Sequence, residues 1–222
     1  VGRVIAPEPV VVTVGLSLGL LRRLCPDHAM MEQLVEGATV LAVAWQERGP
    51  NGGPAEPSCR YADGKLTGGK AWVAGAGGAG GFLVVAEGDA GPVLVLAEAG
   101  ADGLSVEERR QADGSAMGEL SFSGTPAGEL ASGGAVRAAL AEAVNDATAL
   151  AAAELVGLSE RAFEITLDYI KTREQFDKPI GSFQVIQHRA VDLNVMCEVA
   201  QSGVREALGL MDRETDPKAR AR

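Results

Sequence analysis

The sequence predicts a multidomain chain of the α+β class. We expect helices at the N-terminus, a middle antiparallel, barrel-like β domain, and an incomplete helical bundle at the C-terminus. Most of the Gly and Pro residues fall within residues 45–131, where short apolar runs alternate with turn signals. On either side, apolar residues recur every three or four positions, which is typical of helices. We therefore expect three domains: 1–44, the end of an N-terminal helical domain; 45–131, the β domain; and 132–222, the bundle.

The most apolar run of the chain is Val10–Leu24, and Pro26 ends it. With about 15 residues it is shorter than the roughly 18 to 20 that a membrane span needs, so we expect a buried helix and no membrane span. Gly15 and Gly19 have the spacing of a GxxxG motif, which we interpret as close helix packing.

A second, shorter helix is expected over residues 28–36. Asp27 is a good capping residue for its N-terminus. Gly37 follows its last residue and is expected to end the helix.

The middle region contains five apolar runs of strand length, separated by turn residues. Their regular spacing predicts an antiparallel sheet or barrel. The Gly-rich segment 74–81 lacks the Lys-Ser/Thr of a phosphate-binding loop, so we interpret it as a hairpin connection. The expected strands are Lys65–Val73, Phe82–Ala86, Pro92–Ala97, Leu104–Glu108 and Gly118–Phe122.

The C-terminal region predicts two long helices joined by a break at Pro179 and Gly181, with Ser182 capping the second. Two such helices form an antiparallel hairpin, which is half of a four-helix bundle. A half-bundle leaves apolar surface uncovered, so we expect further helices from a partner or from additional chain. The apolar seams are Ala147, Ala151, Leu155, Leu158, Ala162, Ile165 and Tyr169 in the first helix, and Ile186, Ala190, Leu193, Cys197, Ala200, Val204, Leu208 and Met211 in the second.

Charge and cysteine content narrow the function. The net charge of −10 argues against a nucleic-acid partner, because phosphate binding needs a basic face. The three cysteines, Cys25, Cys59 and Cys197, form no metal-binding spacing, so we expect no metal. Their odd number favours a reducing cytoplasm over a disulfide framework.

The bend between the two helices gathers hydrogen-bonding side chains and aromatics that are scarce elsewhere. Residues 169–188 read YIKTREQFDKPIGSFQVIQH. This string, placed after a β domain and between two helices, resembles the acyl-CoA dehydrogenase family. Two further segments are similar to the family: LTGGKAWV, ending at Val73, and the segment from Glu36 to Glu47, which resembles the approach to the first flavin-facing strand.

The resemblance implies an FAD-dependent oxidoreductase that converts an acyl-CoA thioester to trans-2-enoyl-CoA, in fatty acid or steroid side-chain β-oxidation. It implies a homo- or heterotetramer and electron-transfer flavoprotein as the acceptor. The bend would hold the adenosine diphosphate of a neighbouring subunit's FAD, since a guanidinium suits phosphate oxygens. The implied cofactor-binding residues are Arg173, Gln175, Phe176, Gln184 and His188 at the bend, with Trp72 and Gln46 near the flavin ring.

Each bend residue also has a plain structural interpretation. Arg173 could be a solvated helix charge, Phe176 and Phe183 could form a hydrophobic clasp across the bend, and Gln184 could be a surface residue.

The sequence departs from the family at positions that matter for catalysis. Gln46 and Ala74 stand where the family has hydroxyl residues beside the flavin, and Asp177 stands where it usually has Gly. Ala147 occupies the position from which some members supply the catalytic Glu. In most others the base comes from a later segment that this sequence does not contain, so the catalytic base is unassigned and the chain reads as truncated at both ends.

These departures leave alternative functions open. The chain could be a non-catalytic partner in an α2β2 acyl-CoA dehydrogenase, lending the Arg-Gln-Phe bend to its neighbour's FAD. A helical assembly module without flavin is a third hypothesis, which would leave the string from Arg173 to His188 without a purpose.

Overall fold

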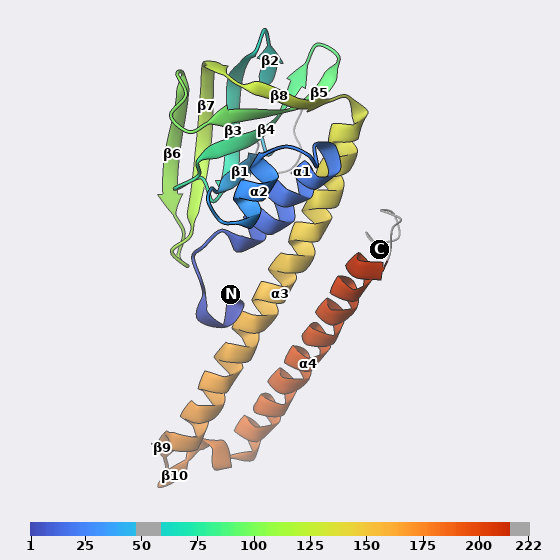
Figure 1. The fold of residues 1–222 in the computed structure, drawn as a ribbon. Coiled ribbons are helices and arrows are strands. Elements are labelled where there is room, and N and C mark those ends of the chain that lie inside the picture. Colours follow the sequence, from blue (N-terminus) through green and yellow to red (C-terminus); the bar gives the residue numbers. More distant parts are fainter. Residues whose placement is uncertain (48–58, 214–222) are drawn as a thin grey trace. The chain divides into compact units, whose positions relative to one another are not determined.

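The computed structural model describes residues 1–47 and 59–213. The chain divides into two compact units, one of residues 7–147 and one of residues 1–6 with 148–222. One helix, α3 (Gly134–Thr172), runs through both (Figure 1). The division into 1–44, 45–131 and 132–222 stays a prediction.

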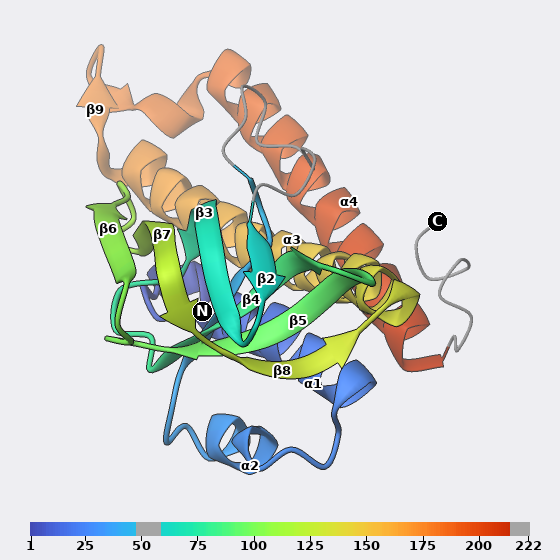
Figure 2. The ribbon, with the colours of Figure 1, turned by 90° about the horizontal axis from the view of Figure 1, so that it is seen from above.

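Residues 7–147 combine a helical layer with one curved sheet (Figure 2). The strand order is β6-β7-β3-β2-β4-β5-β8, with β1 pairing β4, and β6 and β8 form the edges, so the sheet is open and not a closed barrel. The strands are β1 (Leu41–Ala44), β2 (Arg60–Ala62), β3 (Lys65–Ala74), β4 (Gly81–Gly88), β5 (Gly91–Glu98), β6 (Leu104–Arg110), β7 (Ala116–Pro126) and β8 (Gly128–Ser132).

The mixed α and β class is confirmed, and so are the five expected strands. The sheet is not wholly antiparallel, because β1 and β2 each pair with β4 in parallel. The Gly-rich segment after β3 is not a hairpin, since β3 and β4 are separated by β2 in the sheet.

Alternation of side chains along β1 and β4 divides the interior into two cores. Ala42, Ala44, Phe82 and Val84 join one cluster with residues of β3 and β7. Their intervening neighbours on the same strands belong to a second cluster, formed with the helices. Because side chains alternate with a period of two, each strand supplies both faces of the sheet.

Helical elements cover the second core. They are η2 (Val12–Leu18, a π-helix), α1 (Gly19–Leu24), α2 (Met30–Val35) and the first part of α3. The helical run over 10–24 was expected, but not its π-helical half. Asp27 does not cap α2: His28 Nδ1 accepts a hydrogen bond from the Met30 N–H at 3.2 Å. Gly37, with φ +71°, follows the helix as expected.

The GxxxG spacing serves close packing of η2 and α1 against α3. A Cβ on Gly15 would lie 2.7 Å from the Cα of Ala147, and one on Gly19 would lie 3.2 Å from the Cβ of Ala143. Ser17, on the buried side of the same helix, donates a hydrogen bond to the Leu41 carbonyl at 2.6 Å. The helical layer is therefore fixed to α3 on one side and to β1 on the other.

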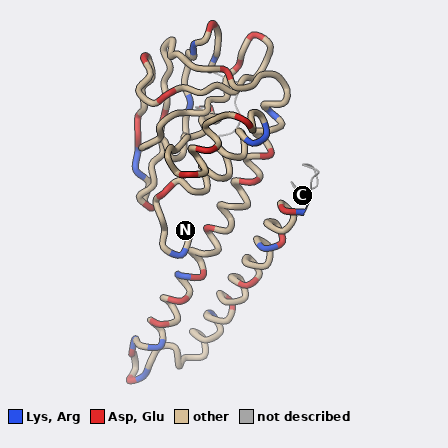
Figure 3. The backbone as a smooth tube through the Cα atoms, viewed as in Figure 1, with Lys and Arg blue, Asp and Glu red and all other residues tan. Residues whose placement is uncertain are grey.

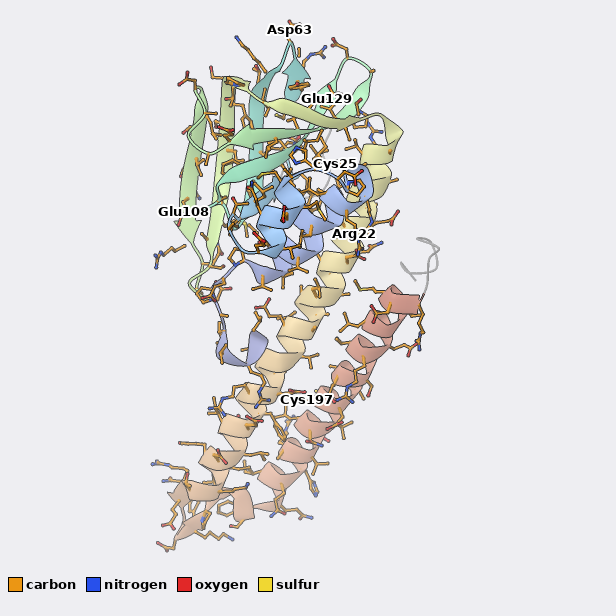
Figure 4. The ribbon with its side chains drawn as sticks, viewed as in Figure 1. Arg22, Cys25, Asp63, Glu108, Glu129 and Cys197 are labelled. Carbon is orange, nitrogen blue, oxygen red and sulfur yellow. The ribbon has the colours of Figure 1, made fainter. Side chains whose placement is uncertain are left out.

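The second unit is a helix hairpin made by the rest of α3 and by α4 (Gln184–Arg213), with η1 (Gly2–Val4) packed on α3. Arg3 pairs with Glu164 at 2.7 Å and Glu160 at 3.3 Å. An apolar groove of about 460 Å³ lies between the two long helices, with Cys197 facing into it (Figure 4). The groove is lined by Ser159, Ala162, Phe163, Thr166, Leu193, Met196, Cys197 and Ala200.

Apolar surface stays uncovered on both long helices, as the half-bundle interpretation expects. Leu155, Ile165 and Tyr169 of α3 and Val191, Met196 and Val199 of α4 are all exposed. Within residues 1–47 and 59–213, no helix combines the length and apolar character of a membrane span.

We expect Gly15→Ala to lower the free energy of unfolding by about 1–3 kcal/mol, because an added Cβ would force the η2 and α3 backbones apart. Urea unfolding followed by circular dichroism measures the change. Gly134→Ala is the matched control, since a Cβ there meets nothing within 4 Å. A Gly15→Ala protein as stable as the control variant would contradict the close contact.

Candidate functional site

The bend between α3 and α4 is a short hairpin followed by one helical turn. Strands β9 (Glu174–Gln175) and β10 (Lys178–Pro179) pair antiparallel, and η3 (Ile180–Ser182) leads into α4. The Arg173 N–H bonds to the Tyr169 carbonyl at 2.8 Å, and the Arg173 carbonyl accepts the Ile180 N–H at 2.8 Å. Arg173 is thus held by its backbone at both the helix end and the hairpin.

Two residues at the hairpin tip have left-handed backbone conformation. Phe176 has φ +56° and Asp177 φ +58°. A two-residue turn with both φ values positive matches the twist of the flanking strands but suits Gly, Asn and Asp. Asp177 fits this requirement, and the same requirement explains the usual Gly at its position. Phe176 does not fit, because a bulky side chain is disfavoured in this region.

The predicted bend residues all direct their side chains to solvent. Phe176 is 85% exposed, and Arg173, Gln175, Gln184 and His188 are also exposed. Among the described residues, the Arg173 guanidinium has no ion pair, although the bend gathers both acidic and basic side chains (Figure 3). An unpaired guanidinium on a fixed backbone is available for an anionic ligand.

The aromatics at the bend do touch. The rings of Phe176 and Phe183 meet edge to face with centroids 6.0 Å apart, and Lys178 Nζ lies 4.4 Å from the Phe183 ring centre. The interpretation of Phe176 and Phe183 as a hydrophobic clasp is therefore correct in that the two rings are in contact. It does not account for the exposure of Phe176, because a clasp alone would bury both rings.

The N-terminus of α4 differs from expectation. Ser182 is not the capping residue. Phe183, with extended backbone, precedes the helix, and its carbonyl accepts from the N–H groups of Ile186 and Gln187. The Gln187 side chain donates to the Gly181 carbonyl at 3.0 Å, which ties the helix start to η3 and leaves Gln184 and His188 facing outward.

The other two predicted site residues belong to the sheet unit. Gln46 follows β1, and its carbonyl accepts a hydrogen bond from the Ala71 N–H at 3.0 Å. Trp72 lies one residue further along β3, with φ +56° and 51% of its surface exposed. The structure thus brings Gln46 and Trp72 together, as it does the five bend residues.

Sequence reasoning missed Lys70, which forms a buried ion pair with Glu47 beside Gln46 and Trp72. A lysine directly before the apolar residues Ala71, Trp72 and Val73 of a strand was the available signal. Buried Cys59 lies in the same core, where burial raises the pKa of its thiol to about 11. That thiol is therefore protonated at neutral pH and is not a nucleophile.

The base position on α3 is closed. Ala147 lies against Gly15, so a longer side chain at 147 would meet the η2 backbone. The neighbouring carboxylate of Asp146 is buried. It pairs with Arg23 at 2.7 Å and with Arg22 at 3.9 Å. Asp146 is thus held in a structural ion pair. Within residues 1–47 and 59–213, no group of three or more His, Cys, Asp or Glu side chains could hold a metal ion.

Comparison with known proteins assigns the C-terminal part of the chain to a family. Residues 134–222 match the model of the acyl-CoA dehydrogenase C-terminal domain. Acyl-CoA dehydrogenase IpdE2 of Mycobacterium tuberculosis is 46% identical over 61 residues, which are 28% of this chain and 19% of that protein. Residues 134–222 therefore belong to the acyl-CoA dehydrogenase C-terminal domain family.

Solved structures extend the similarity to nearly the whole chain. The steroid ACAD Tcur3481-Tcur3483 has a TM-score of 0.82 and 33% identity over 99% of this chain and 61% of its own. The ChsE4-ChsE5 complex of Mycobacterium tuberculosis has a TM-score of 0.81 and 27% identity over 96% of this chain and 59% of its own. This chain therefore spans about three fifths of those structures.

We expect Asp177→Val to weaken the hairpin by about 1–2 kcal/mol, because a β-branched residue is strongly disfavoured at positive φ. Exchange of the Ile180 amide, which bonds to the Arg173 carbonyl, reports on this turn directly. Asp192→Val, at an exposed position of α4, is the control and should change stability by less than about 0.5 kcal/mol. Equal effects of the two substitutions would argue against a strained turn.

Proposed function

We propose that this chain is a subunit of an FAD-dependent acyl-CoA dehydrogenase that introduces an α,β double bond into an acyl-CoA thioester. The observation that carries the proposal is the bend, where a backbone-fixed, unpaired Arg173 stands beside an exposed Phe176 in strained conformation. A strained residue persists only where surrounding structure holds it, and such residues cluster at ligand sites.

The bend residues fit the adenosine diphosphate end of FAD. The planar guanidinium of Arg173 would pair with pyrophosphate oxygens, and the Gln175 amide would add a donor. Phe176 offers its exposed ring to the adenine. Gln184 and His188, in the first turns of α4, would line the same pocket, near the positive end of the helix dipole.

At the flavin ring the fit is incomplete. Trp72 presents an exposed indole that can shield the ring, and Gln46 lies beside it. Neither Gln46 nor Ala74 offers the hydroxyl that the family uses there. When bound, FAD would accept the hydride from the substrate β carbon, while a carboxylate removes the α proton. No residue described here is assigned as that base.

The proposals for substrate and partners are supported by the relatives and by the exposed apolar surface of the long helices. The relatives include a steroid ACAD and other acyl-CoA dehydrogenases, which supports a fatty acyl or steroid-derived thioester and a place in lipid β-oxidation. The exposed apolar faces of α3 and α4 support assembly into a homo- or heterotetramer. Electron-transfer flavoprotein is the proposed acceptor, and the cytoplasm the proposed location.

A second candidate is favoured by the contact between Gly15 and Ala147. In this alternative the chain is the non-catalytic partner of an α2β2 acyl-CoA dehydrogenase and lends its bend to the neighbour's FAD. The closed base position, the paired Asp146 and the absence of hydroxyls at 46 and 74 all support it. The ChsE4-ChsE5 relative is described as a complex, which accords with a heteromeric assembly.

Arg173→Ala should weaken FAD binding about 10- to 100-fold under both candidates, since a charge-assisted hydrogen bond contributes about 1.5–3 kcal/mol. Retention of flavin absorbance during dialysis, followed by titration of the stripped protein with FAD, measures the loss. The chain alone is used for the first candidate, and its complex with the partner subunit for the second. Arg205→Ala removes a guanidinium from an exposed position of α4 and should have no effect. Unchanged retention in the Arg173 variant would exclude the bend from the cofactor site.

Flavin stoichiometry separates the two candidates. A catalytic subunit should bind about one FAD per chain when it is purified alone, whereas a lending subunit should carry flavin only with its partner, at about one per pair of chains. Absorbance from 300 to 550 nm, with protein concentration from amino-acid analysis, gives the ratio. A colourless protein in both preparations would contradict both candidates.

A further inference from the structure

A buried ion pair lies within the sheet unit, away from the surface on which Trp72 is displayed. The side chains of Glu47 and Lys70 are 4% and 2% exposed, and Lys70 Nζ donates to Glu47 Oε1. Their neighbour Cys59 is fully buried in the apolar cluster of β1, β3, β4 and β7. Two opposite charges are therefore enclosed in a hydrophobic core.

Stability alone does not explain such a pair. Removing two charges from water costs about as much as their attraction returns, so a well-packed apolar pair is often as stable. The best-attested role of buried polar groups is to specify one arrangement over another. The relevant question is which arrangement Glu47 and Lys70 select.

The pair adjoins a backbone contact between the end of β1 and strand β3. The Gln46 carbonyl accepts the Ala71 N–H at 3.0 Å, and these two residues are the chain neighbours of Glu47 and Lys70. One backbone hydrogen bond and one ion pair thus join the same two segments at adjacent residues.

A bulge in β3 begins at this point. Lys70 pairs with Leu120 of β7, but the next pairing is Val73 with Gly118. Two residues of β3, Ala71 and Trp72, therefore stand opposite the single residue Glu119. A bulge of this kind shifts which face of the sheet the following side chains occupy.

The bulge determines where the indole lies. In a regular strand, residues two apart share a face, so an inward Lys70 would place Trp72 inward as well. The extra residue reverses this: Ala71 and Val73 are buried and Trp72 is exposed. The left-handed conformation of Trp72 is the local consequence. Without the bulge, burial of Ala71 and Val73 would require Lys70 to face solvent together with Trp72. The bulge is therefore what allows Lys70, Ala71 and Val73 all to be buried while Trp72 stays exposed.

We propose that the Glu47–Lys70 ion pair is a register lock. By holding Lys70 in the core, it excludes the regular strand in which Lys70 would face solvent, and it fixes the bulge and the left-handed conformation in which Trp72 is displayed. Glu47 and Lys70 are thus positioning residues that act through Trp72. That Trp72 in turn orients against the flavin ring rests on the proposed function.

The test uses the full chain with Trp45→Phe, so that Trp72 is the single tryptophan, and without cofactor. Glu47→Leu with Lys70→Met replaces the pair by apolar groups of similar size. We expect amide exchange at Ala71 to become at least about tenfold faster, while the Val84 amide between β4 and β5 stays protected. Quenching of Trp72 emission by acrylamide should change in the same variant.

Arg23→Met with Asp146→Leu is the matched control, since it removes another ion pair of the same unit and should leave Ala71 and Trp72 unchanged. A folded Glu47/Lys70 double variant with unchanged Ala71 exchange and Trp72 quenching would overturn the proposal. If that variant does not fold, Glu47→Asp serves instead, because it keeps both charges but shortens one side chain. It should accelerate Ala71 exchange at least about threefold, and no acceleration would overturn the lock.

The same variants separate the lock from the cofactor assignment. FAD is then titrated into the folded variants. A response of Ala71 and Trp72 with weaker FAD binding supports both proposals. The same response with unchanged FAD binding supports the lock and removes Trp72 from the cofactor site.

Discussion

The close approach of η2 and α1 to α3 is the constraint on which the rest of the sheet unit depends. Gly15 and Gly19 let these backbones meet Ala147 and Ala143 almost directly. With the helices held this close to α3, Ser17 can donate its hydrogen bond to the Leu41 carbonyl of β1. The apolar side chains of the helices then pack against the sheet to form the second core. The close contact also fills the space into which a longer side chain at 147 would extend. The same backbone contact therefore holds the helical layer in place and excludes a catalytic Glu at position 147 of α3.

Much of this architecture follows from local patterns in the sequence. The five strands of the middle region and both long helices were predicted, because apolar periodicity and turn residues specify them locally. Strands β2 and β8 were not predicted, since they are short and contain few apolar residues. Their place depends on pairing with β3, β4 and β5, which periodicity does not encode. The same holds for the parallel pairing of β1 and for the π-helical turns of η2.

The two parts of the candidate site differ in the same way. The bend lies within twenty residues of sequence, so its place between two helices and the grouping of its candidate cofactor residues could be predicted from one motif. The small hairpin of β9 and β10 was not predicted. The part proposed to face the flavin ring joins Gln46 and Glu47 to residues 70–72 through contacts between segments that are distant in sequence. Lys70 was missed for that reason: alone it is a charge in a strand, and only its partner across the core gives it a role. The predicted caps at Asp27 and Ser182 were wrong. The His28 imidazole accepts the Met30 N–H at the start of α2, and Phe183, not Ser182, directly precedes α4.

Phe176 and Trp72 share an unusual combination of properties. The chain has few aromatics, 4% of its residues, yet these two are both exposed and both have φ +56°. Left-handed conformation is unfavourable for a large side chain, and exposure forgoes the hydrophobic gain of burial. Each ring is held by well-defined neighbours: a hairpin between two helices for Phe176, and a bulge beside a buried ion pair for Trp72. An exposed aromatic face can stack on a flat ligand, so each ring by itself fits the contact proposed for it: Phe176 with the adenine, and Trp72 with the flavin ring.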